Sequence, residues 1–199
     1  MSVLFHGSFS LNRHVMSKFL AIGLKKQKAI DEDFCKPFGR GKPFSQRHRS
    51  WLHKTGLAEQ GLPITLTELG SVVFKNDPKL ESDVTQWFLY HELITDPIRA
   101  EAWHFFALEF LPKRKSFSRE DLLEGLANKL RSHSEQHFGP GSTLNKTICR
   151  KILDVFTKEE SLGGLGFIEK SKSSYKILSP KILGPWTTTS KLQRAFDKS

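Results

Sequence analysis

The sequence contains only two cysteines, Cys35 and Cys149, and it has no long run of apolar residues. Two cysteines so far apart form neither a disulfide framework nor a zinc motif, so we expect two free, buried thiols in a reducing compartment. A transmembrane helix needs roughly 18 consecutive apolar residues, which no segment supplies. The chain also starts without the basic and apolar order of a secretory signal. These absences predict a cytoplasmic protein with no membrane partner.

The sequence also lacks the short motifs of common enzymes. It has no P-loop, no GxSxG and no GxGxxG, and its eight histidines include no HExxH. His133 and His137 are four residues apart, so on a helix they would share one face and could bind a metal. Gly139 and Pro140 follow so closely that a frayed helix end is the simpler interpretation.

Basic residues outnumber acidic ones, with 31 Lys and Arg against 21 Asp and Glu, which gives a net charge of +10. An excess of this size indicates a polyanionic partner, either nucleic acid or an anionic membrane surface. Nucleic acid fits a cytoplasmic protein better. Because 38% of the residues are hydrophobic and 16 are Phe, the chain can still build a folded core.

The spacing of apolar residues predicts an α+β fold, mostly α, in which winged helix-turn-helix units flank a helical scaffold. Helix, turn, basic helix and hairpin occur twice in that order, first with a basic helix over 42–54 and a hairpin after Leu57, and again with a basic helix that begins at Ser142. The predicted parts are 1–78 for the N-terminal winged helix-turn-helix, 79–112 for the scaffold, 113–180 for the second winged helix-like unit and 181–199 for a loose or incomplete tail.

The first basic helix carries the stronger DNA-binding signal. No acidic residue occurs between positions 36 and 54, and such a run of Lys and Arg would neutralise phosphates and release counterions. Arg and Gln also match base edges in the major groove. An ordinary solvated charged face is the alternative. The predicted DNA contacts are Arg40, Lys42, Ser45, Gln46, Arg47, Arg49 and Lys54.

The second basic helix and the hairpin after it form a weaker candidate, because Asp154 interrupts the helix. A basic wing can lie along the DNA backbone or enter the minor groove. Packing or partner binding is the alternative. The predicted contacts are Asn145, Lys146, Arg150, Lys151, Lys170 and Lys172, with Lys176 in the same hairpin.

Catalytic residues are harder to identify from the sequence. A nuclease uses two or three carboxylates to hold Mg²⁺ beside a phosphate, but no nuclease motif is present. His6 stands beside Gly7 and Ser8, where it could serve catalysis or phosphate binding; a structural role at the N-terminal anchor is the alternative. The candidate carboxylates are the cluster of Glu68, Asp77, Glu81 and Asp83.

Short motifs recur along the chain in a characteristic order. The opening Phe5-His-Gly-Ser-Phe-Ser-Leu-Asn-Arg13 is followed by Gly39-Arg-Gly-Lys42 before a helix and by Leu66-Thr-Glu-Leu-Gly70 after it. Asp96-Pro97 with Ala102-Trp103, and then Phe117-Ser-Arg-Glu-Asp-Leu122, come further along. Their order and spacing, through Leu178, resemble a bacterial family of formerly unknown function that is encoded beside DNA phosphorothioation genes, the SspB-type family.

The resemblance implies a component of an Ssp-type phosphorothioation system, in which sulfur replaces a non-bridging phosphate oxygen of DNA and marks it as self in anti-phage defence. It implies DNA nicking, with Mg²⁺ as the cofactor. It also implies three protein partners, which are a cysteine desulfurase, an ATPase and an ATP-pyrophosphatase-type sulfur-transfer enzyme. His6 matches the family's histidine near the N-terminus.

We therefore predict a sequence-reading, double-stranded-DNA-binding component of this system, associated with the nucleoid, with Mg²⁺-dependent nicking as a further activity to be tested. Two alternatives stay open. A winged-helix transcriptional regulator without catalysis would usually bind a palindrome as a dimer. An assembly scaffold for sulfur-transfer partners would use its basic faces against acidic proteins and bind DNA weakly.

Overall fold

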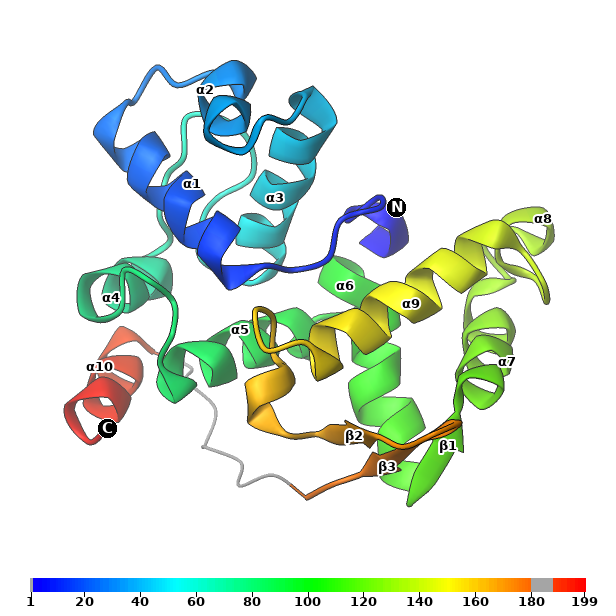
Figure 1. Ribbon diagram of the computed structural model, residues 1–199. Helices are drawn as coiled ribbons and strands as arrows, with labels where there is room; N and C mark the ends of the chain where they lie inside the picture. Colours follow the sequence, from blue (N-terminus) through cyan, green and yellow to red (C-terminus); the bar gives the residue numbers. More distant parts are fainter. Residues whose placement is uncertain (1, 180–187) are drawn as a thin grey trace. The chain divides into compact units, whose positions relative to one another are not determined.

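The computed structural model describes residues 2–179 and 188–199, which fall into two compact units (Figure 1). We name them the α3 unit and the α9 unit after the basic helix that each contains. The division between them lies after Glu92. Among the described residues, the α3 unit contains 5–92 and 188–199, and the α9 unit contains 2–4 and 93–179.

Helices make up the regular structure of the α3 unit. The predicted basic helix over 42–54 is confirmed as α3. The predicted tail over 181–199 lies in part outside the described residues, but its end forms a helix, α10, whose Leu192 is buried. The helices are α1 (Arg13–Lys25), α2 (Asp31–Cys35), the 3₁₀ turn η2 (Lys36–Phe38), α3 (Lys42–Lys54), α4 (Glu68–Asn76), α10 (Thr189–Asp197) and, up to Glu92, α5 (Asp83–Thr95).

Aromatic side chains hold α1, α2 and α3 together. Asn12 starts α1, because its side-chain oxygen accepts a hydrogen bond from the Val15 amide at 3.0 Å. The helix then turns Phe19 inward, where its ring lies 5.0 Å from Phe34 of α2 and 5.9 Å from Phe44 of α3 between centroids. Such ring pairs add to the free energy of area burial, so these three helices form one small core.

The hairpin that the sequence predicts after Leu57 is reduced to a single antiparallel bridge between Ala58 and Leu66. The backbone folds back on itself, with the Glu59 amide donating to Thr65 O at 2.8 Å. Pro63 has no amide hydrogen to donate to a ladder, which limits how far pairing can extend. The prediction of two strands here is therefore wrong.

The α9 unit combines helices with a small sheet. Ser118 and Asp121 form a capping box at the start of α7. Its elements are η1 (Ser2–Leu4), α6 (Pro97–His104), the π-helix η3 (Phe105–Phe110), η4 (Leu111–Lys113), β1 (Ser116–Ser118), α7 (Arg119–Leu130), α8 (Glu135–Phe138), α9 (Thr143–Thr157), η5 (Gly163–Leu165), β2 (Ile168–Lys170) and β3 (Ser174–Ile177).

The sheet is antiparallel, with the strand order β1-β3-β2. The predicted C-terminal hairpin is confirmed as β2 and β3, in which Lys170 pairs with Tyr175 and the Ser171 amide donates to Ser174 O at 2.8 Å. The sequence did not predict β1, a three-residue strand directly before the α7 cap. Because Phe117 of β1 pairs with Tyr175, this short strand fixes the hairpin to the helices.

A cluster of phenylalanines forms the core of the α9 unit. The Phe106 ring lies 5.1 Å from Phe156 of α9 and 5.9 Å from Phe117 of β1 between centroids. Phe110 lies 5.2 Å from the same Phe117 ring. This cluster joins η3, β1 and α9, so it sets where the basic helix stands relative to the sheet.

The observed fold is mostly helical with one small antiparallel sheet, which confirms the predicted α+β, mostly α class. None of the described helices combines the length and apolar character that crossing a membrane requires.

Phe106→Ala tests the role of the phenylalanine cluster. Phe106 is fully buried, and we expect its truncation to lower the free energy of unfolding by about 3–5 kcal/mol, because a large cavity remains. Urea denaturation followed by circular dichroism measures the loss. Ile98, which is 84% exposed, provides the control, since Ile98→Ala should change stability by less than about 0.5 kcal/mol. Equal effects of the two changes would contradict this description of the core.

Candidate nucleic-acid interface

The solvent-facing side of α9 carries two cations and two threonines in one line. Thr143, Lys146, Thr147 and Arg150 are three or four residues apart, so they follow a single face of the helix. Lys146 and Arg150 are exposed, and the Thr147 hydroxyl donates to Thr143 O at 2.9 Å. We call these four residues the α9 stripe. The sequence prediction included its two cations and missed both threonines, although their spacing from Lys146 and Arg150 was a usable signal.

Two other predicted DNA contacts on α9 point into the protein. Asn145 is buried, and its amide donates to Leu123 O of α7 at 2.9 Å. Lys151 is also buried, and its ammonium lies 3.5 Å from the Asp154 carboxylate. Burial lowers the pKa of Lys151, while the Asp154 charge opposes that shift. These side chains hold α9 in place, so they do not belong to its exposed surface.

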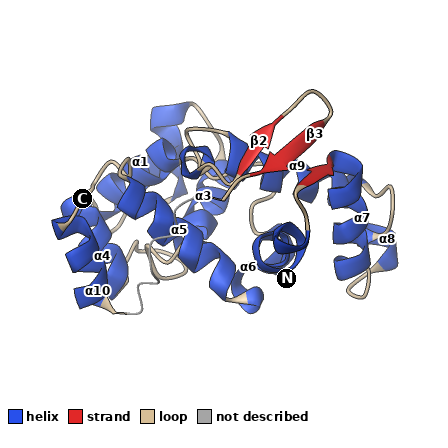
Figure 2. Ribbon diagram, turned by 90° about the horizontal axis from the view of Figure 1, so that it is seen from below, coloured by secondary structure: helices blue, strands red, loops and turns tan. Residues whose placement is uncertain are grey.

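The hairpin beside α9 is basic. Lys170, Lys172 and Lys176 are all exposed, against one exposed acid, Glu169. Lys172 lies in the turn between β2 and β3, and Figure 2 shows this turn at the end of the hairpin. We call this hairpin the wing. All three cations that the sequence indicated for the hairpin are therefore on the surface.

On α3, several predicted contacts are engaged with an acidic residue from α2. The Asp31 carboxylate accepts hydrogen bonds from Ser45 and Arg49, both at 2.7 Å, and lies 3.9 Å from the Lys42 ammonium. Burial alone would raise the pKa of Asp31, but the hydrogen bonds from Ser45 and Arg49 and the nearby positive charges lower it overall. Asp31 lies outside the acid-free segment from 36 to 54, so the sequence reading did not anticipate this neutralisation.

The remaining cations of α3 have mixed environments. Arg47 donates to Phe5 O at 3.3 Å, and the Lys54 ammonium lies 5.8 Å from the centre of the Phe5 ring. Arg40 and Gln46 are exposed, as is Lys42. The exposed basic surface of α3 is thus smaller than the sequence indicates.

A pocket of about 190 Å³ lies beside Gln46 and Arg49, and Gln60 forms part of its wall.

The catalytic candidates do not assemble into a metal centre. His6 is fully buried, with its ring 5.6 Å from Phe5 and 6.4 Å from Trp51 between centroids. Among the described residues, no three His, Cys, Asp or Glu side chains come together in a way that could hold a metal ion. The predicted carboxylates therefore belong to no group of three metal-ligating side chains among the described residues.

The four carboxylates differ in burial and in hydrogen bonding. Asp77 accepts a hydrogen bond from the Ser82 amide at 2.8 Å. Burial raises the pKa of Asp77, but hydrogen bonds from the Ser82 backbone and the Thr85 side chain outweigh it, so the pKa is lowered. Glu68, Glu81 and Asp83 are exposed.

His133 and His137, the other possible metal ligands, contact different residues, and both cysteines are buried. His133 contacts the Glu101 carboxylate at 2.9 Å, whereas His137 contacts the Ser134 hydroxyl at 2.8 Å. Cys35 and Cys149 are free and buried, as the sequence predicts. Burial raises the pKa of the Cys149 thiol to about 11, which keeps it protonated near neutral pH.

Comparisons with known proteins place these features in context. The family model described as "Protein of unknown function (DUF4007)" matches residues 5–175. Two solved structures are similar, "SspB crystal structure" with a TM-score of 0.66 and "Magnesium ion-bound SspB crystal structure" with a TM-score of 0.63. Each is 15% identical, over 90% of this chain and 60% of the SspB chain, so this chain spans less than two thirds of SspB. No curated protein matches the chain.

Asp31→Asn tests the ion-pair cluster at the start of α3. Because the folded pKa of Asp31 lies below its ordinary value of 3.8, its stabilising contribution is complete above that value and is lost as the pH falls through the folded pKa. We expect the variant to lose about 1–2 kcal/mol at neutral pH, and the difference from the wild type to narrow below about pH 4. Urea denaturation across this pH range measures both effects.

Glu32→Gln is the matched control, because Glu32 is exposed on the same helix and the change removes the same charge. A stability loss in the control as large as that of Asp31→Asn, or a gap that stays constant with pH, would contradict the assignment.

Proposed function

Since the chain belongs to the DUF4007 family, we propose that it is a double-stranded-DNA-binding component of a bacterial DNA phosphorothioation system. The observation that carries the DNA-binding part is the α9 stripe, in which Thr143, Lys146 and Arg150 are exposed and Thr147 is half-buried, together with the lysines of the neighbouring wing. A duplex presents a dense row of phosphates, so a surface of this kind suits it.

The order of elements in the α9 unit supports a winged helix-turn-helix. A helical segment, α6 and η3, precedes β1, and α7, α8 and α9 follow before the hairpin of β2 and β3. The strand order β1-β3-β2 puts the first strand against the last. In this arrangement α9 is the recognition helix and the hairpin is the wing.

The chemistry of the α9 stripe suits the major groove. Arg150 can donate two hydrogen bonds to a guanine, while the threonine methyl groups can contact thymine. Lys146 and the wing lysines would contact phosphates, which position the protein without reading the sequence. Asn145 and Lys151 have no part in this surface because they are buried.

The α3 unit offers a second, smaller basic surface. Arg40, Lys42 and Gln46 are exposed there, but Asp31 offsets part of the charge. We assign this surface to auxiliary contacts with the DNA backbone, and we place sequence reading on α9.

The phosphorothioation context rests on family resemblance and is supported by the likeness to SspB. In this context the chain would deliver DNA to the sulfur-transfer proteins, which are a cysteine desulfurase, an ATPase and an ATP-pyrophosphatase-type enzyme. A cytoplasmic location at the nucleoid follows from the same proposal.

A Mg²⁺-dependent DNA nickase is the second candidate, favoured because one of the two similar SspB structures contains a magnesium ion. The described residues of this chain supply no group of three metal-ligating side chains, so we assign no catalytic residue.

Lys146→Gln combined with Arg150→Gln tests the DNA-binding proposal. We expect duplex affinity to fall about tenfold or more. The slope of log affinity against log salt should become shallower by about one to two units, because fewer counterions are released from the DNA when phosphate contacts are lost. Fluorescence anisotropy with a labelled duplex at several salt concentrations gives both quantities.

Lys18→Gln combined with Lys25→Gln is the matched control, since both residues are exposed on α1 and the charge change is the same. Equal losses in the two double variants would mean that net charge alone explains binding. A larger loss in Arg40→Gln combined with Lys42→Gln would place the main DNA surface on α3.

Incubation with supercoiled plasmid tests the nickase candidate. A nickase produces open-circular DNA with Mg²⁺ or Mn²⁺ and none with EDTA, because the metal stabilises the charge that develops at the phosphate. Supercoiled plasmid that stays intact under all conditions, while a gel shift shows binding, would eliminate this candidate for the chain.

A further inference from the structure

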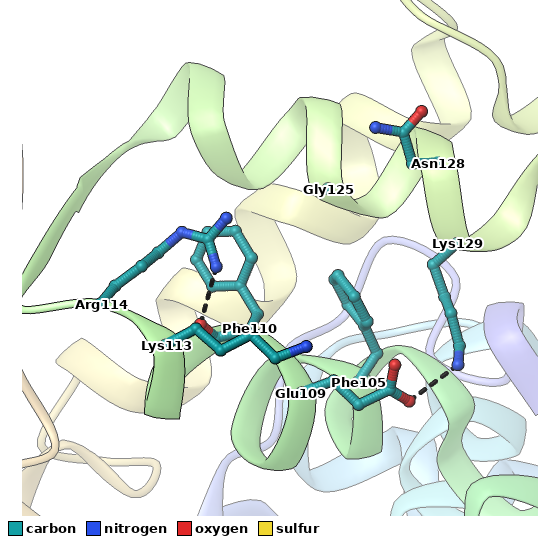
Figure 3. Close-up of a pocket in the computed structure, with 8 residues that line it drawn as sticks. All are labelled: Phe105, Glu109, Phe110, Lys113, Arg114, Gly125, Asn128 and Lys129. Carbon is teal, nitrogen blue, oxygen red and sulfur yellow. Dashed lines mark hydrogen bonds and ion pairs between the residues drawn. The ribbon is translucent and has the colours of Figure 1, made fainter.

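A pocket of about 340 Å³ lies between η3 and α7 in the α9 unit (Figure 3). Its volume is at the lower end of the roughly 300–1,000 Å³ range of small-molecule sites, so it suits a compact ligand. No residue of the α9 stripe or the wing contributes to its lining. The pocket is therefore separate from the proposed DNA surface, and it needs its own explanation.

An irregular helical segment forms one wall of this pocket. The π-helix η3 supplies Phe105, Glu109 and Phe110 to it, and it follows α6, in which Ala100 has non-helical backbone angles (φ −150°, ψ 68°). π-Helical turns are rare and frequently occur at functional sites. The basic connector after η3, which the DNA-binding proposal does not use, contributes Lys113 and Arg114 to the same pocket.

The exposed Arg114 side chain makes two contacts with Phe110. The guanidinium lies 3.9 Å from the centre of the Phe110 ring, and its Nη1 donates to Phe110 O at 2.9 Å. A guanidinium has five N–H donors, so this bond leaves others for a ligand. Because its planar fork matches the oxygens of a phosphate, an arginine in this position suits a phosphate ligand.

The charges around the pocket do not cancel. The Lys129 ammonium pairs with the Glu109 carboxylate at 2.7 Å, while Lys113 is exposed and has no ion pair among the described residues. Three cations, Lys113, Arg114 and Lys129, therefore stand against one carboxylate, Glu109. A phosphate monoester carries a charge of about −1.5 to −2 at neutral pH, which would balance this excess.

The rest of the lining suits a planar ring. Phe105 is half-buried, and Figure 3 shows its ring directed from η3 towards α7, between the Arg114 side and the Lys129 side of the pocket. The Asn128 amide, at the α7 edge, can both donate and accept hydrogen bonds. Aromatic rings and guanidinium planes are the usual stacking surfaces for unpaired bases.

We propose that this pocket binds a nucleoside 5′-monophosphate, either free or as the 5′-phosphorylated end of a DNA strand, with the phosphate on Lys113 and Arg114 and the base against Phe105. The site is independent of the α9 stripe, so it does not depend on the DNA-binding proposal.

Isothermal titration of the full chain with AMP, adenosine and inorganic phosphate tests the proposal. We expect saturable binding of AMP that is tighter than binding of either part alone. Lys113→Gln combined with Arg114→Gln should weaken AMP binding about tenfold, because charge-assisted hydrogen bonds are lost. Glu109→Gln should instead strengthen it, because it removes the carboxylate that competes with the phosphate; misfolding cannot produce such a gain.

The double change on α1, Lys18→Gln with Lys25→Gln, removes the same charge from exposed residues outside both proposed surfaces, so it is the control and should leave AMP binding unchanged. Oligonucleotides with and without a 5′-phosphate then distinguish a DNA end from a free nucleotide. Absence of saturable AMP binding by the wild type, equal affinity in the Lys113 and Arg114 variant, or weaker binding by Glu109→Gln would each overturn the proposal.

Discussion

The packing of Phe106 against Phe117 and Phe156 determines the geometry on which the functional surface depends. These rings join η3, β1 and α9, and β1 in turn pairs with the wing. Neither a three-residue strand nor a hairpin of this length is stable alone. Burial of the rings therefore fixes the α9 stripe and the wing beside one another, and it also fixes η3, which forms one wall of the pocket between η3 and α7.

Where each cation lies matters more than how many the chain has. Lys146 and Arg150 stay exposed on α9, whereas Lys151, next in the sequence, is buried beside Asp154. On α3, Arg49 is held by Asp31 at 2.7 Å. A buried or paired cation contributes little to attracting DNA, because its field is already offset. This distribution is why we place the main DNA surface on α9, although the denser basic sequence lies on α3.

Much of the fold was predictable from the sequence because local signals determine it. Asn12, Ser118 and Ser142 accept hydrogen bonds at the starts of α1, α7 and α9, and these caps can be read directly. The reading failed where partners are distant in the sequence. Residue spacing could not reveal that Asp31 neutralises Arg49 of another helix or that β1 completes the sheet. The pocket at η3 was equally hidden, since its lining comes from two separate segments.

Site-specific photo-crosslinking to a duplex tests the central claim most directly, because it reports contact and not only affinity. A photoreactive amino acid would replace Thr147 in the α9 stripe, Lys172 in the wing, Gln46 on α3 or, as the control, His14, which is exposed on α1. The account predicts strong crosslinks from positions 147 and 172 and none from position 14. Crosslinks from position 46 without any from 147 or 172 would contradict it.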